Sequence, residues 1–190
     1  MKVLAINGSA RKDGNTAILI NLALKELERE GVQTELVQLA GLNLAGCIAC
    51  YKCFENKDKH CAVKNDEMNG IIDKMVAADG LVLGSPTYFA NVTVNLKAVI
   101  ERAGMVGRAN DFMYARKPCA AVVAVRRAGA VQVFNSINDF FLGSQMVVVG
   151  SSYWNIGVGR EIGQVEGDDE GVQTMKQLGA NMAWLMKKLK

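Results

Sequence analysis

Short apolar runs alternate regularly along the chain with longer segments of helical periodicity. Five apolar runs predict strands, at about residues 2–7, 34–39, 80–85, 119–125 and 146–149. Five other segments predict helices, at about residues 16–30, 66–78, 92–104, 131–142 and from 169 onwards. Because the two kinds of element alternate, we expect a parallel sheet with helices on both faces. The pattern predicts one α/β domain over residues 1–190, with a doubly wound five-stranded sheet of order 2-1-3-4-5.

The composition argues against several classes of partner. Lys and Arg number 22 against 19 Asp and Glu, a formal net charge of +3, and the basic residues are scattered, so we expect no nucleic-acid partner. No apolar run approaches the length of a membrane span, and the first residues resemble a strand rather than a signal peptide. We therefore expect a cytoplasmic protein without a membrane partner.

The loop after the first predicted strand, residues 7–16, has the character of a phosphate-binding loop. Gly8 and Gly14 allow tight turns that bring backbone N–H groups close to an anion. The loop also carries the polar donors Ser9, Arg11, Asn15 and Thr16. Asn15 stands where a Walker A loop has its lysine, which disfavours a triphosphate and favours a monophosphate ester such as that of FMN. The alternative is an ordinary loop in which Ser9 and Thr16 only cap the following helix.

The loop after the third predicted strand reaches the same edge of the sheet, because ligands of such folds bind outside the carboxyl ends of strands 1 and 3. It supplies stiffness and aromatic surface through Pro86, Tyr88 and Phe89, and polar groups through Thr87 and Asn91. These residue types suit a flat aromatic ligand. Alternatively, the two aromatic side chains simply cover the edge of the sheet.

Four of the five cysteines, Cys47, Cys50, Cys53 and Cys61, lie within fifteen residues of one another. In a chain without an export signal such crowding indicates metal or redox chemistry rather than a disulfide framework. Three thiolates two residues apart can wrap one face of a [4Fe–4S] cubane, and a fourth can close it. A zinc site and bare thiols remain alternatives, with His60 as a substitute for the last ligand. The fifth cysteine, Cys119, is predicted to be a core residue.

The two loops, together with the segment Leu96-Lys97-x-x-Ile100-x-Arg102, resemble the NADPH-dependent FMN reductase family. The segments at residues 169–171, 178–179 and 183–185 are also similar to that family. The cysteine spacing is similar to that of its iron–sulfur flavoprotein branch. The resemblance implies a flavodoxin-like fold, bound FMN, a reduced nicotinamide donor and a homodimer or homotetramer.

The resemblance also implies roles for individual residues. Ser9, Arg11, Asn15 and Thr16 would hold the FMN phosphate, and Pro86, Thr87, Tyr88, Phe89 and Asn91 would flank the isoalloxazine. Arg126 and Gly129 belong to the expected third flavin loop, at residues 126–130. A positive charge at Arg126 or Arg127 would raise the flavin potential or bind the 2′-phosphate of NADPH, unless both arginines are merely solvated.

The function implied is an FMN-dependent NAD(P)H oxidoreductase that passes hydride to FMN and on to a small acceptor such as a flavin or quinone. No catalytic side chain is expected, because the flavin carries the chemistry. The alternative is an iron–sulfur flavoprotein that exchanges electrons with a ferredoxin-like partner through the cluster on Cys47, Cys50, Cys53 and Cys61.

Overall fold

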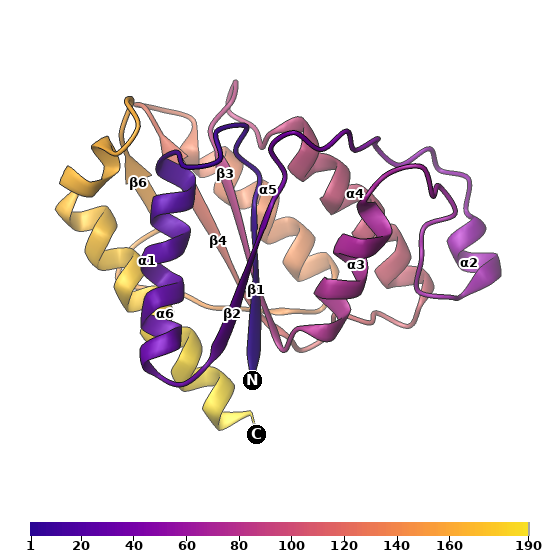
Figure 1. Ribbon diagram of the computed structural model, residues 1–190. Helices are drawn as coiled ribbons and strands as arrows, with labels where there is room; N and C mark the ends of the chain where they lie inside the picture. Colours follow the sequence, from indigo (N-terminus) through magenta and orange to yellow (C-terminus); the bar gives the residue numbers. More distant parts are fainter. Residues whose placement is uncertain (190) are drawn as a thin grey trace.

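The computed structural model describes residues 1–189, and its centre is a parallel sheet (Figure 1). The strands are β1 (Lys2–Asn7), β2 (Gln33–Gln38), β3 (Gly80–Pro86), β4 (Pro118–Val125), β5 (Val147–Val148) and β6 (Ile156–Val158). They are ordered β2-β1-β3-β4-β5, and β6 also pairs with β4. The predicted order 2-1-3-4-5 is therefore confirmed.

The last strand differs from its prediction, because two short strands, β5 and β6, pair with β4 where one strand was expected. β5 pairs with the beginning of β4, and β6 pairs with its end. Between them the chain leaves the sheet, and Asn155 bridges the interruption: its Nδ2 donates to the carbonyl of Ala121, and its own carbonyl accepts from Val123 N–H. The three-residue β6 is too short to give a periodic signal in the sequence.

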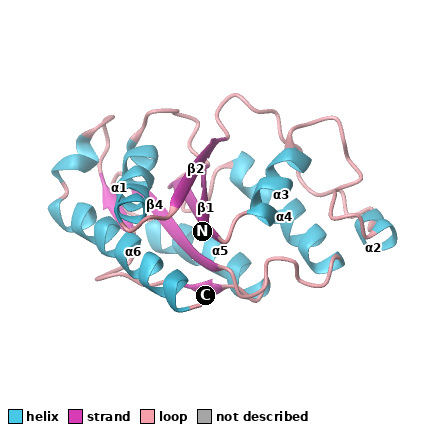
Figure 2. Cartoon of the chain, turned by 60° about the horizontal axis from the view of Figure 1, so that its bottom comes forward, coloured by secondary structure: helices cyan, strands magenta, loops and turns pink. Residues whose placement is uncertain are grey.

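Helices cover both faces of the sheet (Figures 1 and 2). On one face, α1 (Asn15–Arg29) and α6 (Asp169–Lys188) pack on residues of β1, β3 and β4 such as Val3, Val82 and Val122. On the other face, α3 (Met68–Ala77), α4 (Val94–Ala109) and α5 (Ala130–Gly143) pack on their alternate neighbours, such as Leu4 and Leu83. The central strands are buried on both sides, as their unbroken apolar runs predict.

Helix α4 continues five residues beyond its predicted end at Gly104. Two glycines, Gly104 and Gly107, lie in its second half, and Gly107 is required by packing. A Cβ at Gly107 would lie 2.8 Å from the ring of Tyr114, which is fully buried. Glycine at this position leaves room for the Tyr114 ring. Glycine lowers the helix propensity, but burial of the aromatic ring offsets that loss of stability.

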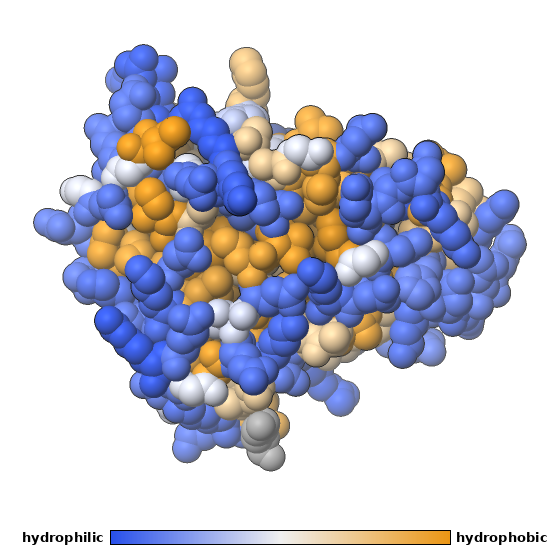
Figure 3. Space-filling model, in the orientation of Figure 1, coloured by the Kyte–Doolittle hydropathy of each residue, from blue (hydrophilic) through white to orange (hydrophobic). Residues whose placement is uncertain are grey.

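Two short helical turns were not expected from the sequence. α2 (Lys52–Asn56) lies in the long connection between β2 and α3, and η1 (Gln164–Gly167) precedes α6. In Figures 1 and 2, α2 is the element furthest from the sheet. The space-filling view shows a mostly hydrophilic surface there, whereas apolar side chains gather between α1 and α3, near edge strand β2 (Figure 3). Within residues 1–189, no helix is both long and apolar enough to cross a membrane.

Candidate functional site

A cavity of about 300 Å³ lies at the carboxyl edge of the sheet, where the loops after β1, β3, β4 and β6 meet. A volume of this size is typical of a small-molecule site. The structure brings most of the predicted flavin-binding residues to its wall: Ser9, Arg11, Asn15, Thr16, Pro86, Thr87, Tyr88 and Arg126. Phe89, Asn91 and Gly129 do not line it. Gly159 and Arg160, which the sequence did not single out, do.

The loop after β1 is held in place by its own hydrogen bonds. Gly8 N–H donates to Gly84 O at 2.8 Å, and Thr93 Oγ1 donates to Gly8 O at 2.7 Å. A Cβ at Gly8 would lie 2.8 Å from Leu96 Cβ and 2.9 Å from Gly84 O, so only glycine fits. Ser9 Oγ accepts from Arg11 N–H at 3.0 Å. Hydrogen bonds within the chain therefore fix the conformation of this loop.

Helix α1 presents an uncapped N-terminus to the cavity. Its N-cap residue is Gly14, no side-chain cap bond is formed there, and the first turn contains no acidic residue. The interpretation that Ser9 and Thr16 only cap the helix is therefore wrong: the Ser9 hydroxyl accepts a hydrogen bond from Arg11 N–H, and Thr16 lies inside α1. Free N–H groups, the positive end of the helix dipole and the Arg11 side chain together suit a phosphate ester.

The Asn15 side chain is already occupied, by the loop after β6. Its Nδ2 donates to Gly159 O at 3.0 Å and Glu161 O at 2.9 Å, and its Oδ1 accepts from Gly163 N–H at 2.9 Å. These three bonds hold the loop that carries Arg160 over the cavity. The Asn15 side chain therefore has a structural role that the sequence did not predict. As a strut, it joins the start of α1 to the loop after β6 by hydrogen bonds.

The loop after β3 forms a tight hairpin turn. Tyr88 and Asn91 exchange backbone hydrogen bonds at 3.0 Å, and the two residues between them, Phe89 and Ala90, adopt left-handed conformations with φ of 49° and 57°. Tyr88 lines the cavity, whereas the Phe89 side chain is fully exposed at the tip. A bulky residue in this conformation stores strain, which is typical of functional loops. Phe89 does not cover the sheet edge.

The loop after β4 packs against this hairpin turn. Gly129 has a φ of +87°, and a Cβ on it would lie 3.1 Å from Ala90 Cβ and 3.2 Å from Thr87 Cγ2. Thr87 is itself tied to β4, because its N–H and its Oγ1 both donate to Ala124 O. Gly129 therefore sets the position of the hairpin without reaching the cavity. Of the two arginines at the end of β4, Arg126 lines the cavity and Arg127 does not.

All four clustered cysteines, Cys47, Cys50, Cys53 and Cys61, line a second, small cavity of about 20 Å³ beside α4. The segment that carries them is unusually bent: Ala49, Tyr51, Lys57 and Lys59 all have positive φ. No group of three or more His, Cys, Asp or Glu residues in the described part of the chain is arranged to hold a single metal ion. Four cysteine thiols around one shared cavity are the ligand set that a [4Fe–4S] cluster takes, so the residue types present fit such a group.

Three of these cysteines contact α4. Cys47 N–H donates to Glu101 Oε2 at 3.2 Å, Arg102 Nε donates to Cys61 Sγ at 3.3 Å, and Cys53 Sγ lies 4.0 Å from Met105 O. Burial raises the pKa of the Cys53 thiol, and the neighbouring Cys61 and Cys47 add to this. Cys50 is exposed.

The two remaining predictions around the cysteines have clear outcomes. His60 Nε2 lies 2.8 Å from Asp73 Oδ1, so its ring is engaged away from the thiols. Cys119 is fully buried in β4, as expected of a core residue, and burial raises the pKa of its thiol.

Helix α4 connects the two cavities. At its N-cap, Thr93 bonds to Gly8 and accepts from Leu96 N–H beneath the phosphate loop. From there to Glu101 and Arg102 the helix rises about 12 Å, at about 1.5 Å per residue. One rigid element therefore positions both the phosphate loop and the cysteines.

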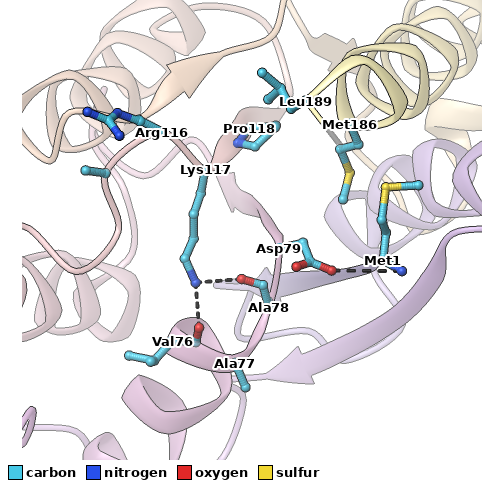
Figure 4. Close-up of a pocket in the computed structure, with 11 residues that line it drawn as sticks. Met1, Val76, Ala77, Ala78, Asp79, Arg116, Lys117, Pro118, Met186 and Leu189 are labelled. Atoms are coloured by element: carbon cyan, nitrogen blue, oxygen red, sulfur yellow. Dashed lines mark hydrogen bonds and ion pairs between the residues drawn. The ribbon is translucent and has the colours of Figure 1, made fainter.

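A third cavity, of about 320 Å³, lies at the opposite, amino edge of the sheet (Figure 4). Lys117 lies beside it, and burial lowers the pKa of this amine to about 8. Its Nζ donates to the carbonyl oxygens of Met75, Val76 and Ala78, at the end of α3. Since an ammonium group has three donors and all are used, the lysine offers no free group to a ligand.

Comparison with known proteins agrees with this geometry. The family model described as NADPH-dependent FMN reductase matches residues 1–161. An iron–sulfur flavoprotein of Methanocaldococcus jannaschii is 36% identical over 195 residues, which cover 100% of this chain and 100% of the relative. Among solved structures, RosB with bound 8-demethyl-8-formylriboflavin-5′-phosphate has a TM-score of 0.75 at 21% identity, over 100% of this chain and 80% of RosB.

A WrbA-like flavodoxin from Agrobacterium tumefaciens has a TM-score of 0.68 at 13% identity, over 100% of this chain and 98% of the flavodoxin chain. At these identities the two solved structures show the flavodoxin-like fold alone. The family match and the full-length relative go further: the chain belongs to the NADPH-dependent FMN reductase family, and it is similar over its whole length to an iron–sulfur flavoprotein.

Proposed function

We propose that this protein is an electron-transfer flavoprotein that holds FMN at the carboxyl edge of the sheet and a [4Fe–4S] cluster on its four clustered cysteines. In this role it exchanges electrons with a ferredoxin-like partner. The observation that carries the proposal is that cysteines spread over residues 47–61 all line one cavity, although only one of them lies in a regular element. Bare structural thiols would not require such a convergence.

The FMN phosphate would be held by the first-turn N–H groups of α1, with Ser9 and Arg11 beside them. Pro86, Thr87 and Tyr88 would flank the isoalloxazine, and Arg126 would place a positive charge near its rim. When bound, FMN supplies a redox centre that handles electrons in pairs or singly. The chain's own contribution is to fix these groups in advance and to leave the cavity open to a partner.

The cluster would be held by Cys47, Cys50, Cys53 and Cys61. When bound, it supplies a one-electron centre whose potential depends on the hydrogen bonds to its sulfurs. Cys50 lines the cavity and is itself exposed, which suits electron exchange with another protein. The full-length similarity to an iron–sulfur flavoprotein supports this assignment.

A second candidate function is hydride transfer from NAD(P)H to FMN and on to a small acceptor such as a flavin or quinone. The observation in its favour is that Arg126 and Arg160 both line the flavin cavity in addition to Arg11. Two further cations exceed what one phosphate ester needs, and they suit an anionic dinucleotide. The family described as NADPH-dependent FMN reductase supports it as well.

Anaerobic titration of the oxidised holoprotein separates the two functions. Reduced ferredoxin should bleach the flavin absorption of the wild type but not that of the Cys61→Ser variant, and NADPH or NADH should bleach neither quickly. Cys119→Ser is the matched control, because Cys119 is buried in β4 away from the cluster cavity. If NADPH bleaches the wild type and the Cys61→Ser variant equally, hydride transfer is the function and the proposed role of the cluster is wrong.

A further inference from the structure

The most completely bonded side chain beside the cysteines is Arg102 of α4, whose guanidinium is 1% exposed. It donates from Nε to Cys61 Sγ at 3.3 Å, from Nη1 to Ala45 O at 3.2 Å and from Nη2 to Val63 O at 2.8 Å. Nη1 also donates to the Asp66 carboxylate. One buried cation thus joins both ends of the cysteine segment to α4.

The charge of Arg102 is balanced within the same cluster of groups. The Asp66 side chain is 4% exposed, and its carboxylate accepts from the N–H groups of Ala45 and Met68 as well as from Arg102. Burial alone would lower the pKa of Arg102, but the hydrogen bonds that it donates to Asp66 and Cys61 outweigh burial and raise that pKa. Burial alone would raise the pKa of Asp66, but its three donors hold it below its ordinary value. Both groups are therefore charged at neutral pH.

Among the four cysteines, the position of the Cys61 sulfur depends most on a contact outside its own segment. Seven residues separate it from Cys53, and two of them, Lys57 and Lys59, lie in left-handed conformations. Its backbone is fixed by Asn69, whose side chain both accepts from Cys61 N–H at 2.8 Å and donates to Cys61 O at 3.0 Å. Asn69 fixes the backbone only, so the direction of the sulfur depends on the bond from Arg102.

We propose that Arg102 is a positioning residue for the cysteine centre: it aims the Cys61 sulfur into the cavity and raises the reduction potential of the cluster that the cysteines hold. The inference rests on the proposed function. Its physical reason is that an N–H donor and a buried positive charge beside a ligand sulfur stabilise the reduced, more negative state of the cluster over the oxidised state. Outer partners of this kind also affect how tightly a metal centre is retained.

The test compares three variants of the full chain. Arg102→Met with Asp66→Asn removes the donor and its counter-charge together, so no unpaired charge is left in the core. Arg102→Lys keeps a cation for Asp66 but lacks the planar fork that serves four partners. Arg108→Met is the matched control, because Arg108 is an exposed residue of the same helix. FMN titration, which reports on the other end of α4, shows that each variant is folded.

We expect the double variant and Arg102→Lys to lower the midpoint potential of the cluster and to lose iron to a chelator about tenfold faster than the wild type. In cluster-free, reduced protein, alkylation of Cys61 should be faster in Arg102→Lys, because this variant frees the sulfur from its donor but keeps a neighbouring cation that favours the reactive thiolate, whereas alkylation of the exposed Cys50 should be unchanged. Arg108→Met should match the wild type in all three measurements.

Two results would contradict the inference in distinguishable ways. A wild-type protein that takes up no iron and sulfide under anaerobic reconstitution would overturn the proposed cluster and this inference with it. A wild type that holds the cluster, with Arg102 variants of unchanged potential and unchanged Cys61 alkylation, would leave the proposed function standing and show that Arg102 only supports the fold.

Discussion

Replacing Asn15 by Ala tests whether this residue is a strut or a phosphate ligand. The structure gives its side chain three hydrogen bonds of 2.9–3.0 Å to the segment from Gly159 to Gly163. A typical intramolecular hydrogen bond contributes about 1 kcal/mol net, and these bonds are partly exposed, so we expect a loss of about 2 kcal/mol in the free energy of unfolding. The loss should be present without FMN, because the bonds are made within the chain.

The assay is urea unfolding of FMN-free protein, followed by fluorescence titration with FMN. Asn21→Ala is the control, because Asn21 is an exposed residue of the same helix and its replacement should change stability by only a few tenths of a kcal/mol. FMN binding should weaken in Asn15→Ala, since the loop that carries Arg160 is released. Unchanged stability of the FMN-free variant, with a large loss of FMN affinity, would refute the strut and make Asn15 a direct phosphate ligand.

Three further predictions concern other parts of the two sites. Asp66→Asn should lower the free energy of unfolding at neutral pH by about 3–5 kcal/mol, because it leaves Arg102 buried without a counter-charge. Since the folded-state pKa of Asp66 is depressed, its contribution exists above the ordinary pKa of 3.8 and is lost as the pH falls through the lower folded value. Urea unfolding should therefore show the wild type and the variant converging in acid, and a constant difference would contradict this. Phe89→Asn should stabilise FMN-free protein by about 0.5–1 kcal/mol in the same assay, because Asn tolerates a φ of 49° better; a loss of stability would show that the turn is not strained. Gly129→Ala should cost about 1–2 kcal/mol and weaken FMN binding in a fluorescence titration, because its φ is +87° and the new methyl group would crowd Ala90; wild-type affinity would show that the hairpin position does not matter.

The parts of the fold that the sequence predicted well depend on strong local signals. The apolar run of β3 has no polar alternation, so it predicted a doubly covered central strand, and the helices on either side show clear periodicity. From these elements the sheet order follows by general rules of connection. The loop after β1 was recognisable because its glycines and donors follow directly in sequence.

The parts that were missed depend on contacts between distant residues. The second half of the last strand, β6, is held by pairing with β4 and by Asn155, and neither leaves a local signal. Arg160 was missed for the same reason: it reaches the cavity through the bonds of Asn15, which lies about 145 residues earlier. Likewise, the sequence could place the cysteines close together but could not show that a buried arginine of α4 lies behind them.

Whether the protein holds both redox centres is settled by measuring flavin, iron and acid-labile sulfide in protein purified without oxygen, together with its visible absorption spectrum. We expect one FMN and one four-iron cluster per chain, with a two-banded flavin spectrum on a broad iron–sulfur background that disappears in Cys61→Ser while the flavin bands remain. A colourless protein that takes up neither FMN nor iron would show that the chain holds neither centre.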